Sequence, residues 1–378
     1  MRAEGEITAW HYQTQRPVCV RWREGRITEV SDTTTTPPED LWLAPGLVDL
    51  QVNGFAGVDF QQDGLEEEDL LTAAQGLRTH GCTRFLLTLI TDSWPKLTAR
   101  LRRLKDLRAN CPELISAIAG WHVEGPFLSA DPGFHGAHEK ELMMDPRPEH
   151  IHELRELTGQ DPLLLTIAPE RKGAFEAIAL ARSLGIRISL GHTNAPAATL
   201  QQAVAAGATG FTHLGNGCSA LLDRHDNILW RVFETPGLTV SLIPDRTHVS
   251  PALFRIIHRQ LGDNSICYVT DSMSAGGAPP GHYRLGKLEL EVGKDQVVRE
   301  PGSPYLAGSA LSPAAGVEFA AQMLGCHWQV CWQRFSEFPA RFMELPSGLS
   351  LGNTLDAFLI RTSPEGAGFR LQALTATS

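Results

Sequence analysis

Apolar runs alternate with helical patterns along most of the chain, from about residue 44 onward. Eight of the runs predict strands buried on both faces, because they are nearly continuous in apolar residues. These runs are residues 47–52, 84–91, 115–124, 163–169, 186–192, 210–213, 238–244 and 266–271. Eight such strands separated by helices predict a (β/α)₈ barrel of the TIM kind, an α/β fold. A doubly wound open sheet is the alternative, which is weakened because no G-x-G-x-x-G turn follows the first strand.

The helical segments between these strands have recognisable ends. Asn194 and Pro196 precede a helix that stops at Gly207, and Ser250 with Pro251 starts a helix that stops at Gly262. These residues match the preferences for an N-cap, a first-turn proline and a C-terminal glycine. Other helices are predicted at residues 66–80, 97–108 and 172–184.

Short alternating strands are predicted at both ends of the chain. They cover residues 6–12, 18–24 and 26–30 near the N-terminus, and 355–360 and 369–372 near the C-terminus. Because such strands cannot form a core alone, we expect the two ends to pair. The sequence thus predicts a small β-sandwich domain from residues 1–43 and 345–378, beside a catalytic barrel formed by residues 44–344.

Composition and charge exclude several classes of protein. The net charge of −10 argues against a nucleic-acid partner, and any anionic substrate needs a local cationic pocket. The acidic N-terminus lacks the apolar stretch of a signal peptide, and no apolar run is long enough to span a membrane. The seven cysteines include no C-x-x-C pair, which predicts a reduced, cytoplasmic protein.

Polar side chains close several of the predicted strands, at the face where a barrel carries its active site. They are Gln51, Asn53, Glu124, His192, His213, His248 just past the seventh strand, and Asp271. A glutamate and two histidines offer three ligands to a divalent metal and leave a fourth position open, as in catalytic zinc sites. A single histidine after a strand is more often structural. Two histidines at the ends of neighbouring strands, each in a turn rich in Gly or Asn, indicate a shared metal.

The same segments carry a family resemblance. The motifs are 44–49 (A-P-G-L-V-D), 122–127 (H-V-E-G-P-F), 136–138 (G-A-H), 189–195 (S-L-G-H-T-N-A), 212–216 (T-H-L-G-N), 248–249 (H-V), 269–271 (V-T-D) and 306–311 (L-A-G-S-A-L). In these motifs the chain resembles the N-acetylglucosamine-6-phosphate deacetylases of the amidohydrolase superfamily. The combination of H-x-E-G-P with G-H-T-N-A is specific, because amidohydrolases in general share neither.

The resemblance implies a role for each of these polar residues. Glu124, His192 and His213 would be metal ligands, Asp271 the catalytic acid and base, and His248 the group that polarises the acetyl carbonyl. Many amidohydrolases bind a second metal through an H-x-H pair, where this chain has Gln51-Val52-Asn53. One divalent metal ion is therefore implied, with Gln51 positioning the attacking water. Zinc is the first candidate, and iron and manganese are the alternatives.

The implied reaction is hydrolysis of the acetamide of N-acetylglucosamine 6-phosphate to glucosamine 6-phosphate and acetate. The resemblance also implies a set of substrate-binding residues: Ala137, His138, Asn216, Gly217, Arg224, His225, His248 and Leu306. Arg224 and His225 are the best local candidates for binding the phosphate. In some family members a similarly placed arginine comes from the neighbouring subunit, which would make this protein a homodimer.

The identity of the substrate stays open at this stage. Residues 215–219 replace an Asn-Ala-Met found in many members, and Arg224 could instead be neutralised by Asp223 and Asp226 in a plain surface loop. One alternative is hydrolysis of another N-acyl compound, such as N-acetylgalactosamine 6-phosphate or an unphosphorylated N-acetyl sugar. Another is a catalytically silent sugar-phosphate-binding protein. Such a protein would be expected to have lost the base or a ligand, and this chain has lost neither.

Overall fold

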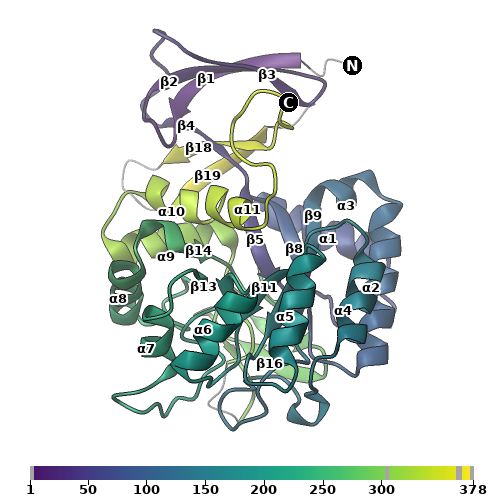
Figure 1. The fold of residues 1–378 in the computed structure, drawn as a ribbon. Coiled ribbons are helices and arrows are strands. Elements are labelled where there is room, and N and C mark those ends of the chain that lie inside the picture. Colours follow the sequence, from purple (N-terminus) through teal and green to yellow (C-terminus); the bar gives the residue numbers. More distant parts are fainter. Residues whose placement is uncertain (1–3, 303–305, 363–367, 375–378) are drawn as a thin grey trace.

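The computed structural model describes residues 4–302, 306–362 and 368–374. Its centre is an eight-stranded parallel barrel, in which the strands neighbour one another in chain order (Figure 1). The strands are β5 (Leu47–Val52), β8 (Cys82–Ile90), β9 (Ile118–Glu124), β10 (Leu163–Ile167), β11 (Arg187–Leu190), β12 (Gly210–Phe211), β13 (Thr239–Leu242) and β14 (Ile266–Tyr268). The barrel nearly closes between its first and last strands, where Val52 bridges Ser272 and the Asn53 N–H donates to the Ser272 carbonyl over 2.8 Å. The predicted barrel is confirmed.

Helices surround the barrel and cover its outer face (Figure 1). They are α1 (Glu67–Thr79), α2 (Trp94–Ala109), α3 (Pro112–Ala117), α4 (Pro148–Thr158), α5 (Ala174–Ser183), α6 (Ala197–Ala206), α7 (Ile228–Phe233), α8 (Pro251–Leu261), α9 (Pro313–Leu324), α10 (Trp328–Arg334) and α11 (Glu337–Phe342), with the 3₁₀ turns η1 (Lys140–Leu142) and η2 (Asp263–Ser265). Helix α8 begins as predicted, because the Ser250 side chain accepts from the Leu253 N–H. Helix α6 begins after Pro196 and not at Asn194, whose side chain accepts from Arg231 instead.

One predicted strand is too long at its N-terminal end. Residues 115–117 belong to α3 and not to β9, since Pro112 occupies the first turn of that short helix, where its fixed backbone angle favours a helix start. Leu114 is the buried residue of this helix, whereas Ile115 is apolar but 47% exposed, so it extends the apolar run without belonging to the buried strand. Apolar content alone therefore could not separate helix from strand here.

The two chain ends form one six-stranded mixed sheet, in the order β19-β18-β4-β1-β2-β3. Its strands are β1 (Glu4–His11), β2 (Pro17–Arg23), β3 (Arg26–Asp32), β4 (Leu41–Pro45), β18 (Ala357–Thr362) and β19 (Phe369–Leu374). Only two residue pairs join β1 to β4, and residues from both halves of the sheet share one apolar core, so the sheet folds over itself. This confirms the small β-domain formed by both chain ends, and its exact boundaries stay a prediction.

We call this element the end sheet. Strand β4 leads directly into β5, so the end sheet lies over the N-terminal ends of the barrel strands (Figure 1).

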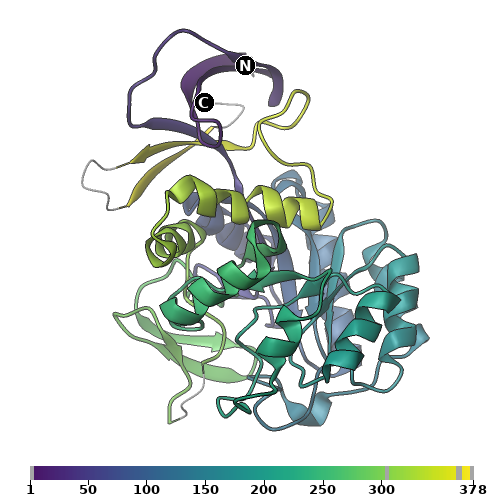
Figure 2. The same ribbon diagram turned by 60° about the vertical axis from the view of Figure 1, so that its left-hand side comes forward.

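A three-stranded insertion follows the last barrel strand, and sequence patterns did not predict it. It consists of β15 (Gly281–Leu285), β16 (Leu288–Val292) and β17 (Val298–Arg299). It packs on the small ribbon of β6 (Gly54–Phe55) and β7 (Val58–Asp59), where Asp59 accepts from the Gly286 N–H over 2.8 Å. The insertion lies across the barrel from the end sheet (Figures 1 and 2). In the described part of the chain, no helix is long and apolar enough to cross a membrane.

Candidate active site

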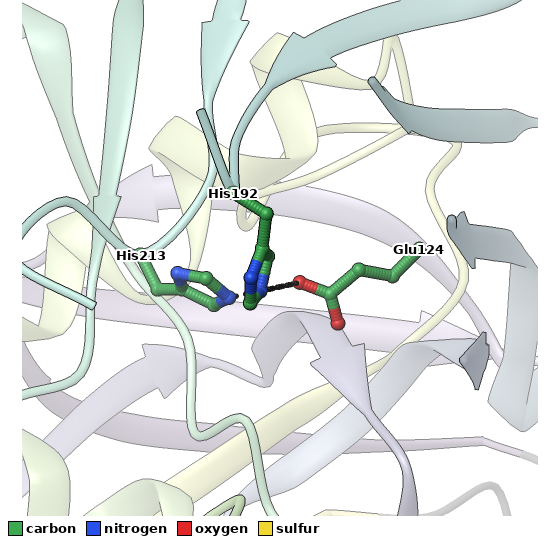
Figure 3. Close-up of side chains that lie close together, drawn as sticks. All are labelled: Glu124, His192 and His213. Atoms are coloured by element: carbon green, nitrogen blue, oxygen red, sulfur yellow. Dashed lines mark hydrogen bonds and ion pairs between the residues drawn. The ribbon is translucent and has the colours of Figure 1, made fainter. Parts of the chain in front are cut away.

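Three predicted ligand side chains meet at one face of the barrel (Figure 3). Glu124 ends β9, while His192 and His213 follow β11 and β12 by two residues each. The Glu124 Oε1 atom lies 2.8 Å from His213 Nε2 and 3.4 Å from His192 Nε2, and all three residues are buried. Their candidate ligand atoms all lie within 4.8 Å of one another. This donor set suits a divalent metal ion, because it combines one carboxylate with two imidazoles.

The ring of His192 is held so that one nitrogen remains available to an ion. Its Nδ1–H donates to the Phe134 carbonyl over 2.8 Å, which leaves the lone pair of Nε2 on the side of Glu124. Gly136 and Gly217 pack against the same ring, where an added Cβ would come within 2.9 and 2.8 Å of ring atoms. Glycine is therefore required at both positions. Because Gly136 precedes Ala137 and Gly217 follows Asn216, both predicted substrate-binding segments pack around the ring of His192.

The electrostatics of the cluster also favour a cation. Burial by itself would raise the pKa of Glu124, but hydrogen bonds and charge from His192 and His213 outweigh burial and hold that pKa well below its usual range. Burial lowers the pKa of His213, yet the Glu124 carboxylate beside it produces a net increase. A buried carboxylate that stays ionised needs positive charge next to it, which a divalent ion supplies.

The backbone turns in the same way after three of the strands. His192, His213 and Asp271 have φ angles of 48°, 31° and 50°, all in the left-handed region. Non-glycine residues adopt this conformation rarely, at a cost of roughly 1–3 kcal/mol each. The repeated turn directs three polar side chains towards one point at the carboxyl face of the barrel.

Asp271 is held in place by Asn53 at the point where the barrel closes. The Asn53 Nδ2–H donates to Asp271 Oδ1 over 2.7 Å. Burial raises the pKa of Asp271 to about 6, with His213 and His248 opposing this rise and Glu124 adding to it. A carboxyl group with a pKa near 6 can both accept and donate a proton around neutral pH.

His248 lies in the loop between β13 and α8 and is oriented by Asp245. Its Nδ1–H donates to Asp245 Oδ2 over 2.6 Å, and its backbone N–H donates to the other carboxylate oxygen over 2.8 Å. The sequence interpretation did not assign Asp245 a role. The three-residue spacing of D-x-x-H was the signal that could have identified it.

Two further predicted residues border the group of Glu124, His192 and His213, which we call the ligand cluster. Gln51 donates its side-chain N–H to Glu124 Oε2 over 3.0 Å, while its Oε1 atom is buried without a hydrogen-bond partner among the described residues. His138 hydrogen-bonds Thr91 Oγ1 through Nδ1, and its Nε2 lies 4.0 Å from Glu124 Oε2. Burial lowers the pKa of His138 to about 3, so its ring is neutral at physiological pH.

The remaining predicted substrate residues fall into two groups. Ala137, Asn216 and Leu306 are half-buried near the cluster: Ala137 precedes His138, and Asn216 donates its side-chain N–H to the His213 carbonyl. Leu306 leads into a segment whose Ser309 N–H donates to the Asp271 carbonyl.

Arg224 and His225 form the second group, because they are exposed and do not join the cluster. Asp226 pairs with Arg231 over 2.6 Å, and Asp223 accepts from the backbone N–H groups of His225 and Asp226. Neither carboxylate neutralises Arg224, whose guanidinium has no partner among residues 4–302, 306–362 and 368–374. The surface-loop alternative with mutual neutralisation is therefore not what the structure shows.

Known proteins resemble this chain in sequence and in fold. It is 31% identical over 317 residues to the N-acetylglucosamine-6-phosphate deacetylase of Danio rerio, which covers 81% of this chain and 76% of that relative. It is 30% identical over 298 residues to the enzyme of the same name from Vibrio furnissii, covering 79% and 73%. No family model matches the chain.

Solved structures give the same result. N-acetyl-D-glucosamine-6-phosphate deacetylase from Mycobacterium smegmatis has a TM-score of 0.86 and 28% identity to this chain, with 98% of both chains covered. A point mutant of that enzyme in complex with N-acetyl-D-glucosamine-6-phosphate has a TM-score of 0.85 and 28% identity, covering 99% of this chain and 98% of the mutant.

Proposed function

The chain belongs to the N-acetylglucosamine-6-phosphate deacetylase family, and on that premise we propose that it hydrolyses the acetamide of N-acetylglucosamine 6-phosphate. The products are glucosamine 6-phosphate and acetate. The observation that carries this proposal is the buried group of Glu124, His192 and His213, with Asp271 at the same face of the barrel. A catalytically silent binding protein would have no use for that combination of ligands and a titratable carboxyl group.

Glu124, His192 and His213 are the proposed ligands of one divalent metal ion. When bound, such an ion activates a water molecule at neutral pH and polarises the acetamide carbonyl. Zinc is the metal that we propose first, since a set of one glutamate and two histidines is common at catalytic zinc sites. Iron and manganese are outcomes that elemental analysis would distinguish.

Asp271 is the proposed acid and base. Its carboxylate accepts the proton of the attacking water and returns it to the departing nitrogen, since an amide anion is too poor a leaving group. The hydrogen bond from Asn53 fixes one carboxylate oxygen and leaves the other for proton transfer. The raised pKa of Asp271, about 6, suits a group that must take up and release a proton in each turnover.

His248 and Gln51 are the proposed orienting groups for the carbonyl and the water. Asp245 accepts the Nδ1–H of His248 and so orients the ring, and the doubly protonated ring can donate its Nε2–H to the acetyl oxygen as negative charge develops there. The buried Oε1 of Gln51 is free to accept a hydrogen bond from the attacking water. Both groups are held by carboxylates, Asp245 and Glu124, so their positions are set before substrate binds.

Arg224 is the proposed phosphate-binding residue, supported by His225 and by Ala137, His138, Asn216, Gly217 and Leu306 around the sugar. The guanidinium is exposed and forms no ion pair with the residues that the structure describes, which supports this role. We also propose a homodimer, supported by Leu221, which is 91% exposed three residues before Arg224. A cytoplasmic location is proposed because none of the seven cysteines, all of which lie in the described residues, forms a disulfide.

Acetate release from N-acetylglucosamine 6-phosphate tests the function directly. Purified protein is stripped with a chelator, reloaded separately with zinc, iron or manganese, and assayed on the phosphorylated and unphosphorylated N-acetyl sugars. The proposal expects metal-dependent release that is fastest with N-acetylglucosamine 6-phosphate. No release with any of the three metals would refute it, and equal rates on both sugars would refute the role of the phosphate.

A further inference from the structure

A second cavity lies far from the ligand cluster, between the end sheet and the barrel. Its volume is about 350 Å³, which falls within the range of about 300–1,000 Å³ typical of small-molecule pockets. Its walls come from the C-terminal turn of α1, the start of β8, α3 and residues 346–356 before β18. We call it the seam cavity.

The charge lining the seam cavity is positive, although the whole chain carries a net charge of −10. Its charged lining residues are Arg78, Arg84 and Asp356. The one carboxylate is already shared, because Asp356 Oδ2 accepts from the Thr83 hydroxyl over 2.6 Å and lies 3.4 Å from Arg84 Nε. The lining thus contains two guanidinium groups and one carboxylate, and that carboxylate already accepts a hydrogen bond.

The arginine donors in this cavity have few partners. The half-buried Arg78 side chain has no hydrogen bond or ion pair with any residue in the described ranges. Arg84 Nε is fully shielded from solvent, yet no described residue forms a hydrogen bond with it. Each guanidinium carries five N–H donors in a planar fork that suits phosphate oxygens. The hydroxyl groups of Ser116, Ser347 and Thr354 line the same space and add further donors.

The seam cavity and the ligand cluster lie at opposite ends of the barrel. Arg84 lies near the start of β8, whereas Ile90 at its end pairs with Glu124. Six residues of extended strand place about 20 Å between these two positions, at about 3.3 Å per residue. A ligand in the seam cavity therefore cannot reach the site of acetamide hydrolysis.

We propose that the seam cavity binds a phosphate dianion, either as inorganic phosphate or as the phosphate group of a small ester. Arg78 and Arg84 hold the anion, and the three hydroxyl groups complete its hydrogen bonding. Because these residues come from both the barrel and the segment leading into the end sheet, binding ties the two parts together. This inference is independent of the proposed deacetylase activity.

Calorimetric titration of the metal-loaded enzyme with inorganic phosphate tests the proposal, with Arg78→Gln as the main variant. Arg78 has no side-chain hydrogen bond or ion pair with the described residues to lose, so the variant should fold normally, whereas Arg84→Gln also breaks the pair with Asp356. Phosphate affinity should fall about tenfold or more in Arg78→Gln, the loss expected for a charged hydrogen bond. Arg259→Gln, the same change at an exposed arginine of α8, should bind phosphate like the wild type.

Arg224→Gln separates the seam cavity from the proposed substrate site. Loss of phosphate binding in Arg78→Gln but not in Arg224→Gln supports the proposal, and the reverse pattern overturns it. Unchanged phosphate affinity in Arg78→Gln also overturns it. Repeating the titration with glucosamine 6-phosphate in Arg224→Gln and in the Arg78→Gln/Arg224→Gln double variant identifies the source: binding that the double variant loses indicates a phosphate ester, and equal binding by the two variants indicates free phosphate. In phosphate-free buffer, Arg78→Gln should keep the wild-type kcat/KM.

Discussion

The ligand cluster and the loop that carries Arg224 are held in opposite ways. Glu124, His192 and His213 are buried at the strand ends of one barrel, where Gln51 donates to Glu124 and the Phe134 carbonyl accepts from His192. The loop of residues 219–226 is held mainly by its own turn, in which Asp223 accepts from two backbone N–H groups. In our proposal, the fold therefore holds the groups that cleave the amide bond in place before the substrate binds. The loop that carries Arg224 takes up its final position only when the sugar phosphate or a second subunit binds.

Among tests of the buried reaction site, Asp271→Asn should have the largest effect. It removes the acid and base without removing a proposed ligand, so kcat should fall by about 10²–10⁴-fold. Metal content, measured by elemental analysis, should stay at the wild-type level. Glu124→Gln is the contrasting variant, because it should lose metal and activity together. If Asp271→Asn also loses its metal, Asp271 is a ligand and the division of roles is wrong.

A smaller loss of activity is expected for a residue that only orients another side chain, as Asp245 orients His248. Asp245→Asn should lower kcat by about 10–100-fold, the range for groups that orient a functional histidine. KM should change little, since Asp245 positions His248 and does not bind the sugar in our proposal. Asp245→Glu keeps a carboxylate and should recover part of the rate. Equal losses in both variants, with lower thermal stability, would point to a purely structural role.

The exposed loop of residues 219–226 is tested by Arg224→Gln. The KM for N-acetylglucosamine 6-phosphate should rise about tenfold, as expected for loss of one charged hydrogen bond, and kcat should stay unchanged. Rates with unphosphorylated N-acetylglucosamine should not change. Arg224→Lys retains the charge and serves as the matched control. A fall in kcat with both sugars would instead place Arg224 within the reaction machinery.

The last prediction concerns the stability of the barrel frame behind the site, and not turnover. Burial raises the pKa of Asp49 to about 7, although Thr270 and the Gln51 N–H donate hydrogen bonds to it. The protonated form of Asp49 is therefore favoured in the folded state. The contribution of this protonated group to the free energy of unfolding is fully present below about pH 4. It is lost as the pH rises towards 7, at up to about 1.4 kcal/mol per pH unit.

Urea unfolding of the wild type and Asp49→Asn across this pH range measures the effect. The difference in unfolding free energy between the two proteins should change between pH 4 and pH 7 and level off above that range. A constant difference at every pH would show that Asp49 titrates alike in the folded and unfolded states.

Sequence patterns predicted the barrel well because parallel strands buried on both faces are nearly continuous in apolar residues. They did not predict the insertion of β15, β16 and β17, since these strands alternate exposed with more buried side chains and lack a continuous apolar run. The start of β9 was misjudged because Ile115 in α3, although exposed, continues the apolar run of the strand.

The positions of Glu124, His192, His213 and Asp271 could be predicted as a group, because barrel topology brings strand ends together. The role of Asp245 could not, because it depends on a hydrogen bond within an irregular loop. The placement of Arg224 was also beyond sequence patterns, since no periodicity describes residues 219–226.

The left-handed backbone at His192, His213 and Asp271 has a consequence for how this protein can be improved. Glycine would remove the backbone cost of roughly 1–3 kcal/mol at each position, so the backbone conformation alone would favour a glycine variant at each of these three sites. Every such variant would lose a side chain that we propose for metal binding or proton transfer. Thermal tolerance and turnover are thus opposed at these positions, and engineering for robustness should begin at the other end of the barrel.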